Sequence, residues 1–157
     1  MLSLWIVGRA PTTNKMLKAH PQTRGKQRRD WRDATEKAMG SLTTEIPLPH
    51  IDENGLTAWK KADRAGREAF VAEHGELLRS RCFGRVEVTA RPWHPDGRSV
   101  PDPDGISLAA KWSLDWLTEN AFLVTDTRHH VDAIHLIRAR IEPMIDGVAM
   151  RLVIEAA

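Results

Sequence analysis

Two repeating patterns of apolar side chains occur along this chain, and together they limit the folds that it can adopt. Residues 85–91 alternate apolar and polar side chains as half-buried strands do, with Val86, Val88 and Ala90 on the apolar side. Residues 106–120 repeat apolar side chains at every third or fourth position, as helices packed on one face do. Both periods within 157 residues predict a single domain in which helices pack on a sheet.

Three segments in the first half of the chain add further elements. Residues 1–8 predict a first strand, 26–39 a helix that ends near Gly40, and 56–71 a second helix, with a continuation to Leu78 past Gly75 as the alternative. Residues 41–55 carry two prolines and an Asn-Gly pair, which indicate a loop.

The end of the chain predicts a β-hairpin. Residues 131–141 and 148–154 both alternate apolar and polar side chains, and the turn-forming stretch EPMIDG lies between them. The full order is strand, helix, helix, strand, helix, strand, strand. This order predicts an α+β fold with a small mixed sheet.

The composition excludes several classes of protein. No stretch approaches the roughly 18 apolar residues of a transmembrane helix, so no contact with a membrane is expected. The start, MLSLWIVGRAP, lacks the charged leader and long apolar run of a signal peptide. A lone cysteine, Cys82, excludes an intramolecular disulfide and a zinc site built on cysteines. We therefore expect a cytoplasmic protein.

Charge is distributed unevenly along the chain. Residues 1–29 hold no acid and seven bases, so subtracting this +7 from the net charge of +2 leaves −5 for the remainder. A basic segment on a mildly acidic protein is typical of binding to a polyanion, most often a nucleic acid. A solvated basic arm without a partner is the alternative. The seven bases are Arg9, Lys15, Lys18, Arg24, Lys26, Arg28 and Arg29.

Asp102-Pro103-Asp104 is the first candidate for chemistry. Proline disfavours helix at the residue before it, and residues i and i+2 of an extended chain point to the same side, so the two carboxylates are expected to converge. Converging carboxylates repel each other unless a cation lies between them, and oxygen ligands suit Mg²⁺ or Mn²⁺. The alternative is a solvated Pro/Gly loop.

Lys111 and Asp126 are further candidates. Lys111 follows Asp104 by two helical turns and is placed to stabilise a phosphate oxygen, but its spacing also suits an i,i+4 ion pair with Asp115. Asp126 follows an apolar stretch after the helix, and it either returns to the Asp102 and Asp104 pair or begins a turn.

Two adjacent histidines and several tryptophans are weaker candidates for binding. His129 and His130 are expected to point to opposite faces of an extended segment, which favours surface or interface positions over shared metal binding. Trp93, in the connection before the acidic pair, is a candidate for stacking on a base, with anchoring of the loop as the alternative. Core positions are expected for Trp5, Trp31 and Trp112.

Together these motifs resemble the RusA family of Holliday junction resolvases, in particular its divergent phage and prophage members. The shared features are PTTN after a first strand, a basic helix, Asp-x-Asp, K-x-x-x-D-x-L, and an Asp shortly after that helix. The similarity is strongest over DPDGISLAAKWSLDWLTENAFLVTD, residues 102–126, and looser over 1–39 and 83–155. Residues 41–80 look like an insertion in a single RusA-like domain spanning 1–157.

The resemblance implies a homodimeric endodeoxyribonuclease that uses Mg²⁺, or alternatively Mn²⁺, to cut four-way DNA junctions by paired nicks in recombination or repair. It also implies a bacterial or phage-infected host cell. Asp102, Asp104 and Asp126 match the family's metal-binding carboxylates, and Lys111 matches its catalytic lysine. DNA contacts are expected from Asn14, Lys15, Lys18, Arg24, Lys26, Arg28, Arg29 and Arg98.

The chain also departs from the family pattern. Gly105 stands where an asparagine usually follows the second Asp, and Pro101 stands where a basic residue often precedes the first. A second hypothesis is therefore a catalytically degenerate relative that binds junctions without Mg²⁺ and without cutting them. A third is that the three aspartates coincide by accident in a ribonuclease or an interaction module.

Overall fold

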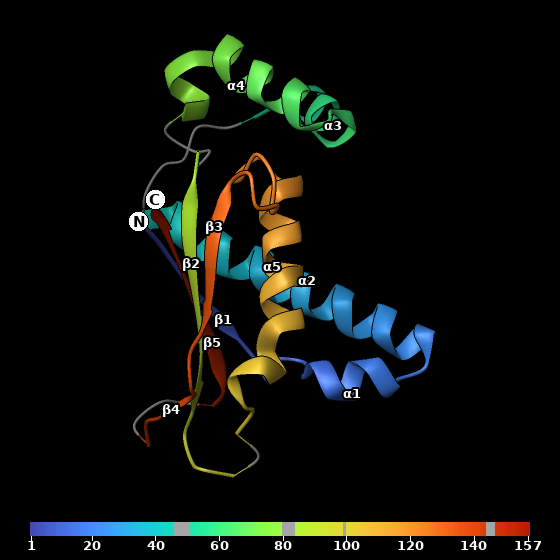
Figure 1. Cartoon of the computed structure of the whole chain (residues 1–157), viewed down its shortest axis with the longest axis vertical. Coiled ribbons are helices and arrows are strands. Elements are labelled where there is room, and N and C mark those ends of the chain that lie inside the picture. Colours follow the sequence, from blue (N-terminus) through green and yellow to red (C-terminus); the bar gives the residue numbers. More distant parts are fainter. Residues whose placement is uncertain (46–50, 80–83, 99, 144–146) are drawn as a thin grey trace.

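A mixed β-sheet forms one layer of the molecule, and helices cover one of its faces (Figure 1). The computed structural model describes residues 1–45, 51–79, 84–98, 100–143 and 147–157. The strands are β1 Leu2–Val7, β2 Val86–His94, β3 Val131–Leu136, β4 Arg140–Ile141 and β5 Ala149–Ala156. The helices are α1 Thr13–Lys18, α2 Pro21–Glu45, α3 Glu53–Lys61, α4 Arg64–Arg79 and α5 Ser107–Glu119, with a 3-10 turn, η1 Pro103–Ile106, directly before α5.

The strand order is β1-β5-β2-β3, and β4 also pairs with β2. β5 runs antiparallel to both β1 and β2, whereas β3 and β4 run parallel to β2. The predicted α+β class with a small mixed sheet is confirmed. Among the described residues, no helix combines the length and the apolar character that crossing a membrane requires.

The predicted hairpin between 131–141 and 148–154 is wrong. β2 lies between them, because it pairs with β3 and β4 on one side and with β5 on the other. Turn residues permit a hairpin but do not choose the strand's partner. In the central position β5 buries Met150, Leu152 and Ile154 completely, as its alternation predicts. Part of the predicted turn, residues 144–146, lies outside the described residues, as does Cys82.

The segment 131–141 also differs from its predicted form. It is two short strands separated by residues without strand geometry, and of its predicted apolar face only Val131 is buried. β3 lies at the edge of the sheet, where a strand with alternating apolar and polar side chains does not have to bury its apolar side.

The core lies between the sheet and helices α2 and α5. The predicted apolar positions of β2 and of 106–120 are buried, as are Trp31 and Trp112. The indole nitrogen of Trp31 donates to the Ala109 carbonyl at 2.9 Å and to the Ser113 hydroxyl at 3.1 Å, which ties α2 to α5. Trp5, in contrast, is 44% exposed, so its predicted core position is wrong.

Helix α2 is longer than predicted at both ends. Pro21 begins it, and proline is well suited to the first helical position because its missing N–H has no partner there. The predicted end at Gly40 is wrong, since the helix continues to Glu45. Met39 is 2% exposed in the core, and this burial offsets the cost of about 1 kcal/mol for a glycine within a helix.

Residues 51–79 form two helices rather than one over 56–71. The Asp52 side chain accepts from the Gly55 amide at 2.7 Å and caps α3, and Asp63 accepts from the Gly66 amide at 2.8 Å at the start of α4. Of the predicted loop 41–55, residues 41–45 belong to α2 and 46–50 lie outside the described residues. Both helices lie beyond one end of the sheet, at the top of Figure 1.

Candidate functional site

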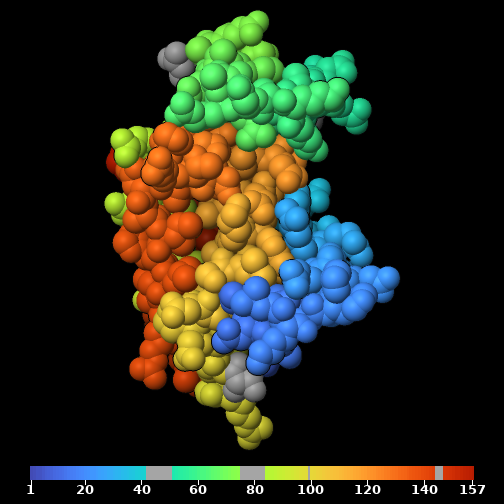
Figure 2. Space-filling view, turned by 45° about the vertical axis from the view of Figure 1, so that its right-hand side comes forward, coloured from blue at the N-terminus to red at the C-terminus, as the bar shows by residue number. Residues whose placement is uncertain are grey.

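The Pro-Thr-Thr-Asn and Asp-Pro-Asp segments, far apart in the sequence, lie against each other (Figure 2, blue and yellow). The Thr13 hydroxyl accepts from the Leu108 amide at 3.3 Å and lies 2.9 Å from the Ser107 hydroxyl. It is also 3.3 Å from the carbonyl oxygens of Asp104 and Gly105. One threonine side chain therefore joins the start of α1 to the start of α5.

Both segments line an open pocket of about 540 Å³, here called the acidic pocket. Its two ionisable side chains, Asp102 and Asp104, are exposed. Its lining residues are Thr12, Thr13, Asn14, Val100, Pro101, Asp102, Asp104, Gly105 and Ser107. The structure thus brings together three predicted site residues, Asn14, Asp102 and Asp104.

The backbone reaches this arrangement by another route than predicted. Asp102 is extended, with ψ at 157°, but Pro103 opens the turn η1, and the Gly105 amide donates to the Asp102 carbonyl at 2.9 Å. An extended chain through Asp104 is therefore a wrong prediction. Proline restricts the residue before it and not the residue after it, so a turn rather than strand alternation brings the two carboxylates to one pocket.

A second group of charges, here called the lysine cluster, consists of Arg28, Lys111, Asp115 and Asp126. The Lys111 ammonium lies 2.5 Å from Asp115 Oδ1 and also donates to Asp126 Oδ2. Arg28 lies 3.3 Å from the other oxygen of Asp115. The i,i+4 pair predicted for Lys111 is present, and it coexists with the contact to Asp126.

Burial and charge oppose each other in this cluster. Partial burial on its own raises the pKa of Asp126, but the hydrogen bond and the charge of Lys111 outweigh it, so the pKa lies below its ordinary value. Partial burial likewise lowers the pKa of Lys111, but hydrogen bonds to Asp115 and Asp126 outweigh it, and this pKa is raised. At neutral pH Lys111 is therefore a cation and Asp126 an anion.

Asp115 is a member of the cluster that sequence reasoning did not count as a site residue. Its side chain is 19% exposed and binds both Lys111 and Arg28. The K-x-x-x-D spacing was the available signal, since it places the two side chains on one face of a helix. Nothing in the sequence marks the second contact, which joins α5 to α2.

Helices α3 and α4 hold the segment that leads to Asp126. The Trp59 indole nitrogen donates to the Thr118 carbonyl at 2.6 Å, and Arg67 donates to the Val124 carbonyl at 3.0 Å. The Arg67 guanidinium also lies 5.4 Å from the centre of a Trp59 ring. Trp59 is fully buried in a small cluster with Ala121 and Val124. The segment expected as an insertion thus supports the turn between α5 and Asp126.

The acidic pocket offers ligands of the kind that a divalent ion needs. Exposed carboxylate oxygens at Asp102 and Asp104 are the ligand type that Mg²⁺ prefers. Across the described parts of the chain, however, no three side chains of His, Cys, Asp or Glu are placed to share one ion. Asp126 instead lies against Lys111. The chemistry of the acidic pocket fits such an ion, and the three-carboxylate site stays a prediction.

The expected DNA-binding side chains are all exposed. Asn14, Lys15 and Lys18 lie on α1, the four bases from Arg24 to Arg29 lie on α2, and Arg98 follows β2. Lys26 is paired with Asp30 at 2.6 Å and Arg28 with Asp115. Among the described residues, no ion pair is formed by Arg9, Lys15, Lys18, Arg24, Arg29 or Arg98.

Two other predictions are only partly right. His129 is exposed, but His130 is buried with its Nε2 3.5 Å from Glu68, and this burial lowers the pKa of His130. Trp93 lies within β2 rather than in a connection. Its ring meets Trp5 edge-on at 4.9 Å, which is an anchoring contact between strands.

Comparisons with known proteins give no relative. The chain matches no protein-family model, no curated protein and no solved structure. Its function is therefore inferred from the motifs and from the arrangement of these side chains.

Proposed function

We propose that this chain is an endodeoxyribonuclease that uses Mg²⁺ or Mn²⁺ to cut four-way DNA junctions by paired nicks. One observation supports this most: the two motifs shared with the RusA family, PTTN and Asp-x-Asp, meet in one pocket. Carboxylates for a divalent ion and a fixed cation for the phosphate are the groups that phosphodiester hydrolysis requires.

Asp102 and Asp104 would hold the ion, with Asp126 as the third expected ligand. An ion held by these carboxylates would supply a water of lowered pKa and would stabilise the attacking and leaving oxygens. Lys111 donates to a phosphate oxygen and stabilises the charge that develops there. Asp115 and Asp126 hold the Lys111 ammonium in position, and Arg28 holds Asp115.

DNA is bound by the exposed lysine and arginine side chains of α1 and α2. These side chains contact phosphates, so junctions are recognised by shape, and affinity falls steeply with salt. Paired nicks need two active sites, one at each of the two strands that are cut. We therefore expect the enzyme to act as a homodimer.

The test is cleavage of a labelled synthetic four-way junction in Mg²⁺, in Mn²⁺ and in EDTA. Wild type is expected to make paired symmetric nicks only with a metal ion. Asp126→Asn is expected to bind the junction without nicking it. Asp33→Asn, which removes an exposed acid of α2 outside the site, is expected to cut like wild type. Failure of wild type to cut the junction in either metal ion would refute the proposal, whether or not the junction is bound.

The second candidate is a junction-binding protein without cleavage activity. The contact of Asp126 with Lys111, together with the lack of a three-ligand group among the described residues, favours it. It predicts junction binding in EDTA and no nicks in either metal ion. Preferential cutting of RNA would instead support a ribonuclease.

A further inference from the structure

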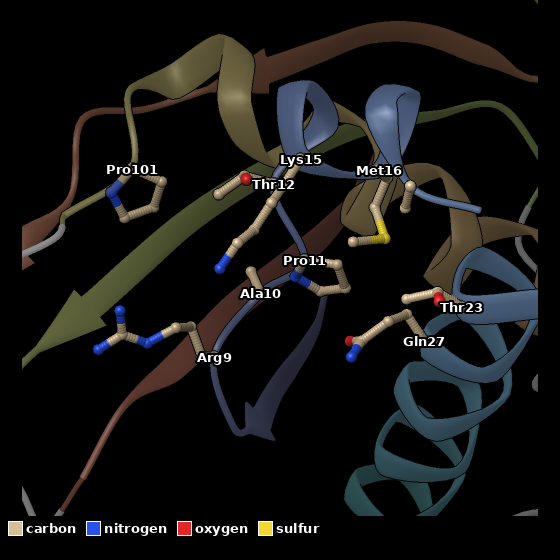
Figure 3. Close-up of a pocket in the computed structure, with 10 residues that line it drawn as sticks. Arg9, Ala10, Pro11, Thr12, Lys15, Met16, Thr23, Gln27 and Pro101 are labelled. Atoms are coloured by element: carbon tan, nitrogen blue, oxygen red, sulfur yellow. The ribbon is translucent and has the colours of Figure 1, made fainter.

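A second pocket lies beside the acidic pocket and shares Thr12 and Pro101 with it (Figure 3). Its volume is about 640 Å³, which lies within the range of pockets that bind small organic ligands. It is formed by the segment after β1, by α1 and by the first turns of α2. We call it the basic pocket, because Arg9 and Lys15 line it.

One end of the basic pocket is positively charged. Figure 3 shows the charged ends of Arg9 and Lys15 on the same side of the pocket as Pro101, a residue that also lines the acidic pocket. Both side chains are exposed, and neither forms an ion pair with any described residue. An arginine and a lysine without acidic partners favour an anion between them, and a phosphate suits this pair.

The middle of the pocket is apolar. Ala10 is 6% exposed and Met16 is 5% exposed. Pro11, which also lines the pocket, is buried as well. The thioether of Met16 is polarisable and makes favourable contacts with aromatic rings. This surface therefore suits the flat face of a ring system rather than a second charge.

The far end of the pocket carries uncharged polar groups from α2. In Figure 3, Thr23 and Gln27 lie on the side opposite Arg9, and the Gln27 amide extends from its helix toward Pro11. Gln27 is half-buried. An amide presents a donor and an acceptor together, which is the pattern that recognises the edge of a nucleobase.

Two basic side chains, an apolar floor and an amide follow one another across the basic pocket. In this order they match a phosphate, the face of a ring and the edge of a nucleobase. We propose that the basic pocket binds one unpaired nucleotide of the DNA strand that is cut at the acidic pocket. Its phosphate lies between Arg9 and Lys15, and its base lies on Met16 beside Gln27. This inference rests on the proposed function, because it assigns the strand in the basic pocket to the same substrate.

An unpaired nucleotide is required because a base inside a duplex does not expose both its face and its edge to a pocket. Proteins that read single bases in this way take them out of the stack, and the cost is lowest where pairing is already disturbed, as at a branch point. The shared wall at Thr12 and Pro101 makes this nucleotide a near neighbour of the phosphate at the acidic pocket. The basic pocket would then set a base preference next to the cut.

The test measures binding in EDTA, so that it does not depend on cleavage. The probes are six-nucleotide single strands that carry abasic sites at five positions and one of the four bases at the sixth. Wild type is expected to bind the best of the four about tenfold more tightly than the worst. Gln27→Met keeps the size of the side chain, removes the amide, and is expected to reduce this ratio to about one while leaving the mean affinity similar.

Two further variants separate phosphate contacts from base recognition. The double variant Arg9→Gln/Lys15→Gln is expected to weaken all four probes by about tenfold or more with the ratio between them unchanged. Gln22→Met, at an exposed position of α2 outside the pocket, is expected to bind like wild type. Thermal unfolding of each variant checks that it is folded, and Thr23→Val replaces Gln27→Met if the latter unfolds.

The outcomes distinguish the two proposals. Equal affinity of wild type for all four bases, or an unchanged ratio in a folded Gln27→Met variant, overturns the nucleotide pocket even if junctions are cut. A ratio that depends on Gln27 in a protein that cuts no junction supports the pocket and refutes the nuclease.

Discussion

The contact between Trp59 and Thr118 makes a prediction that is independent of any activity. Trp59 is fully buried, and its indole nitrogen donates to the Thr118 carbonyl at 2.6 Å at the end of α5. Trp59→Phe keeps an aromatic ring but removes this hydrogen bond and leaves a small cavity. A lost buried hydrogen bond costs about 1–1.5 kcal/mol and the smaller ring about another 1 kcal/mol, so we expect the free energy of unfolding to fall by about 2–2.5 kcal/mol.

Thermal unfolding followed by circular dichroism measures this loss as a fall in melting temperature of about 5–10 °C for a chain of this length. The matched control is Trp116→Phe, the same chemical change at a half-buried ring that stacks on Phe122. No hydrogen bond of the Trp116 indole nitrogen is found within the described residues. The control is expected to lose about 1 kcal/mol or less.

The same substitution tests whether α3 and α4 position Asp126. Hydrogen exchange of the amides in 120–126 is expected to rise clearly more in Trp59→Phe than in Trp116→Phe, because the first variant loses a buried hydrogen bond to Thr118 whereas the second keeps an aromatic ring beside Phe122. Equal losses of stability in the two variants, or unchanged exchange in Trp59→Phe, would refute the view that this indole anchors the turn.

Three further predictions concern the site. Because the pKa of Asp126 is lowered, its pair with Lys111 stabilises the fold above the ordinary carboxyl pKa of 3.8, and this contribution is lost as the pH falls below it. Urea unfolding should therefore show wild type losing about 1 kcal/mol more than Asp126→Asn between about pH 6 and pH 3, a figure reduced for the exposure of Lys111. Thr13→Val leaves the Leu108 amide without its acceptor, so the free energy of unfolding, measured in urea, should fall by about 1–2 kcal/mol, with junction cleavage reduced as well. Titration of junction affinity against salt should give a slope that Lys18→Gln reduces by about one, and an unchanged slope would remove that lysine from the DNA contacts.

Local patterns predict the elements whose faces are set by burial alone. β2, β5 and α5 each bury one side against the same core, so the apolar positions of these segments follow from alternation or from the helical period. Burial alone does not determine which strands pair with each other. β5 lies between β1 and β2, and this depends on contacts between residues at opposite ends of the chain, such as Leu4 opposite Leu152. A turn-forming sequence before β5 carries no information on such contacts.

The candidate site likewise has one part that the sequence shows and one part that depends on long-range packing. Asp102, Asp104 and Lys111 lie within one short stretch, so their motif is visible in the sequence. The contacts that give the site its shape are long-range: Thr13 reaches Ser107, and Arg28 reaches Asp115. Each depends on how α1 and α2 pack on α5, which no local pattern specifies. For that reason the second contact of Asp115 went unpredicted, although its spacing from Lys111 was evident.

Under the proposed function, the lysine cluster would contribute to catalysis more than to DNA binding. Its two bases and two acids cancel, so the cluster as a whole attracts a phosphate only weakly. A lysine has three N–H donors, and Asp115 and Asp126 occupy two of those of Lys111, which leaves one for a phosphate oxygen without breaking either pair. If the proposed function holds, the attraction that brings DNA to the site comes from the lysine and arginine side chains of α1, α2 and the segment after β1 that form no ion pair within the described residues. Under the proposed function, affinity and cleavage would therefore belong to different side chains, and the aspartates beside Lys111 would orient its remaining donor rather than supply charge for binding.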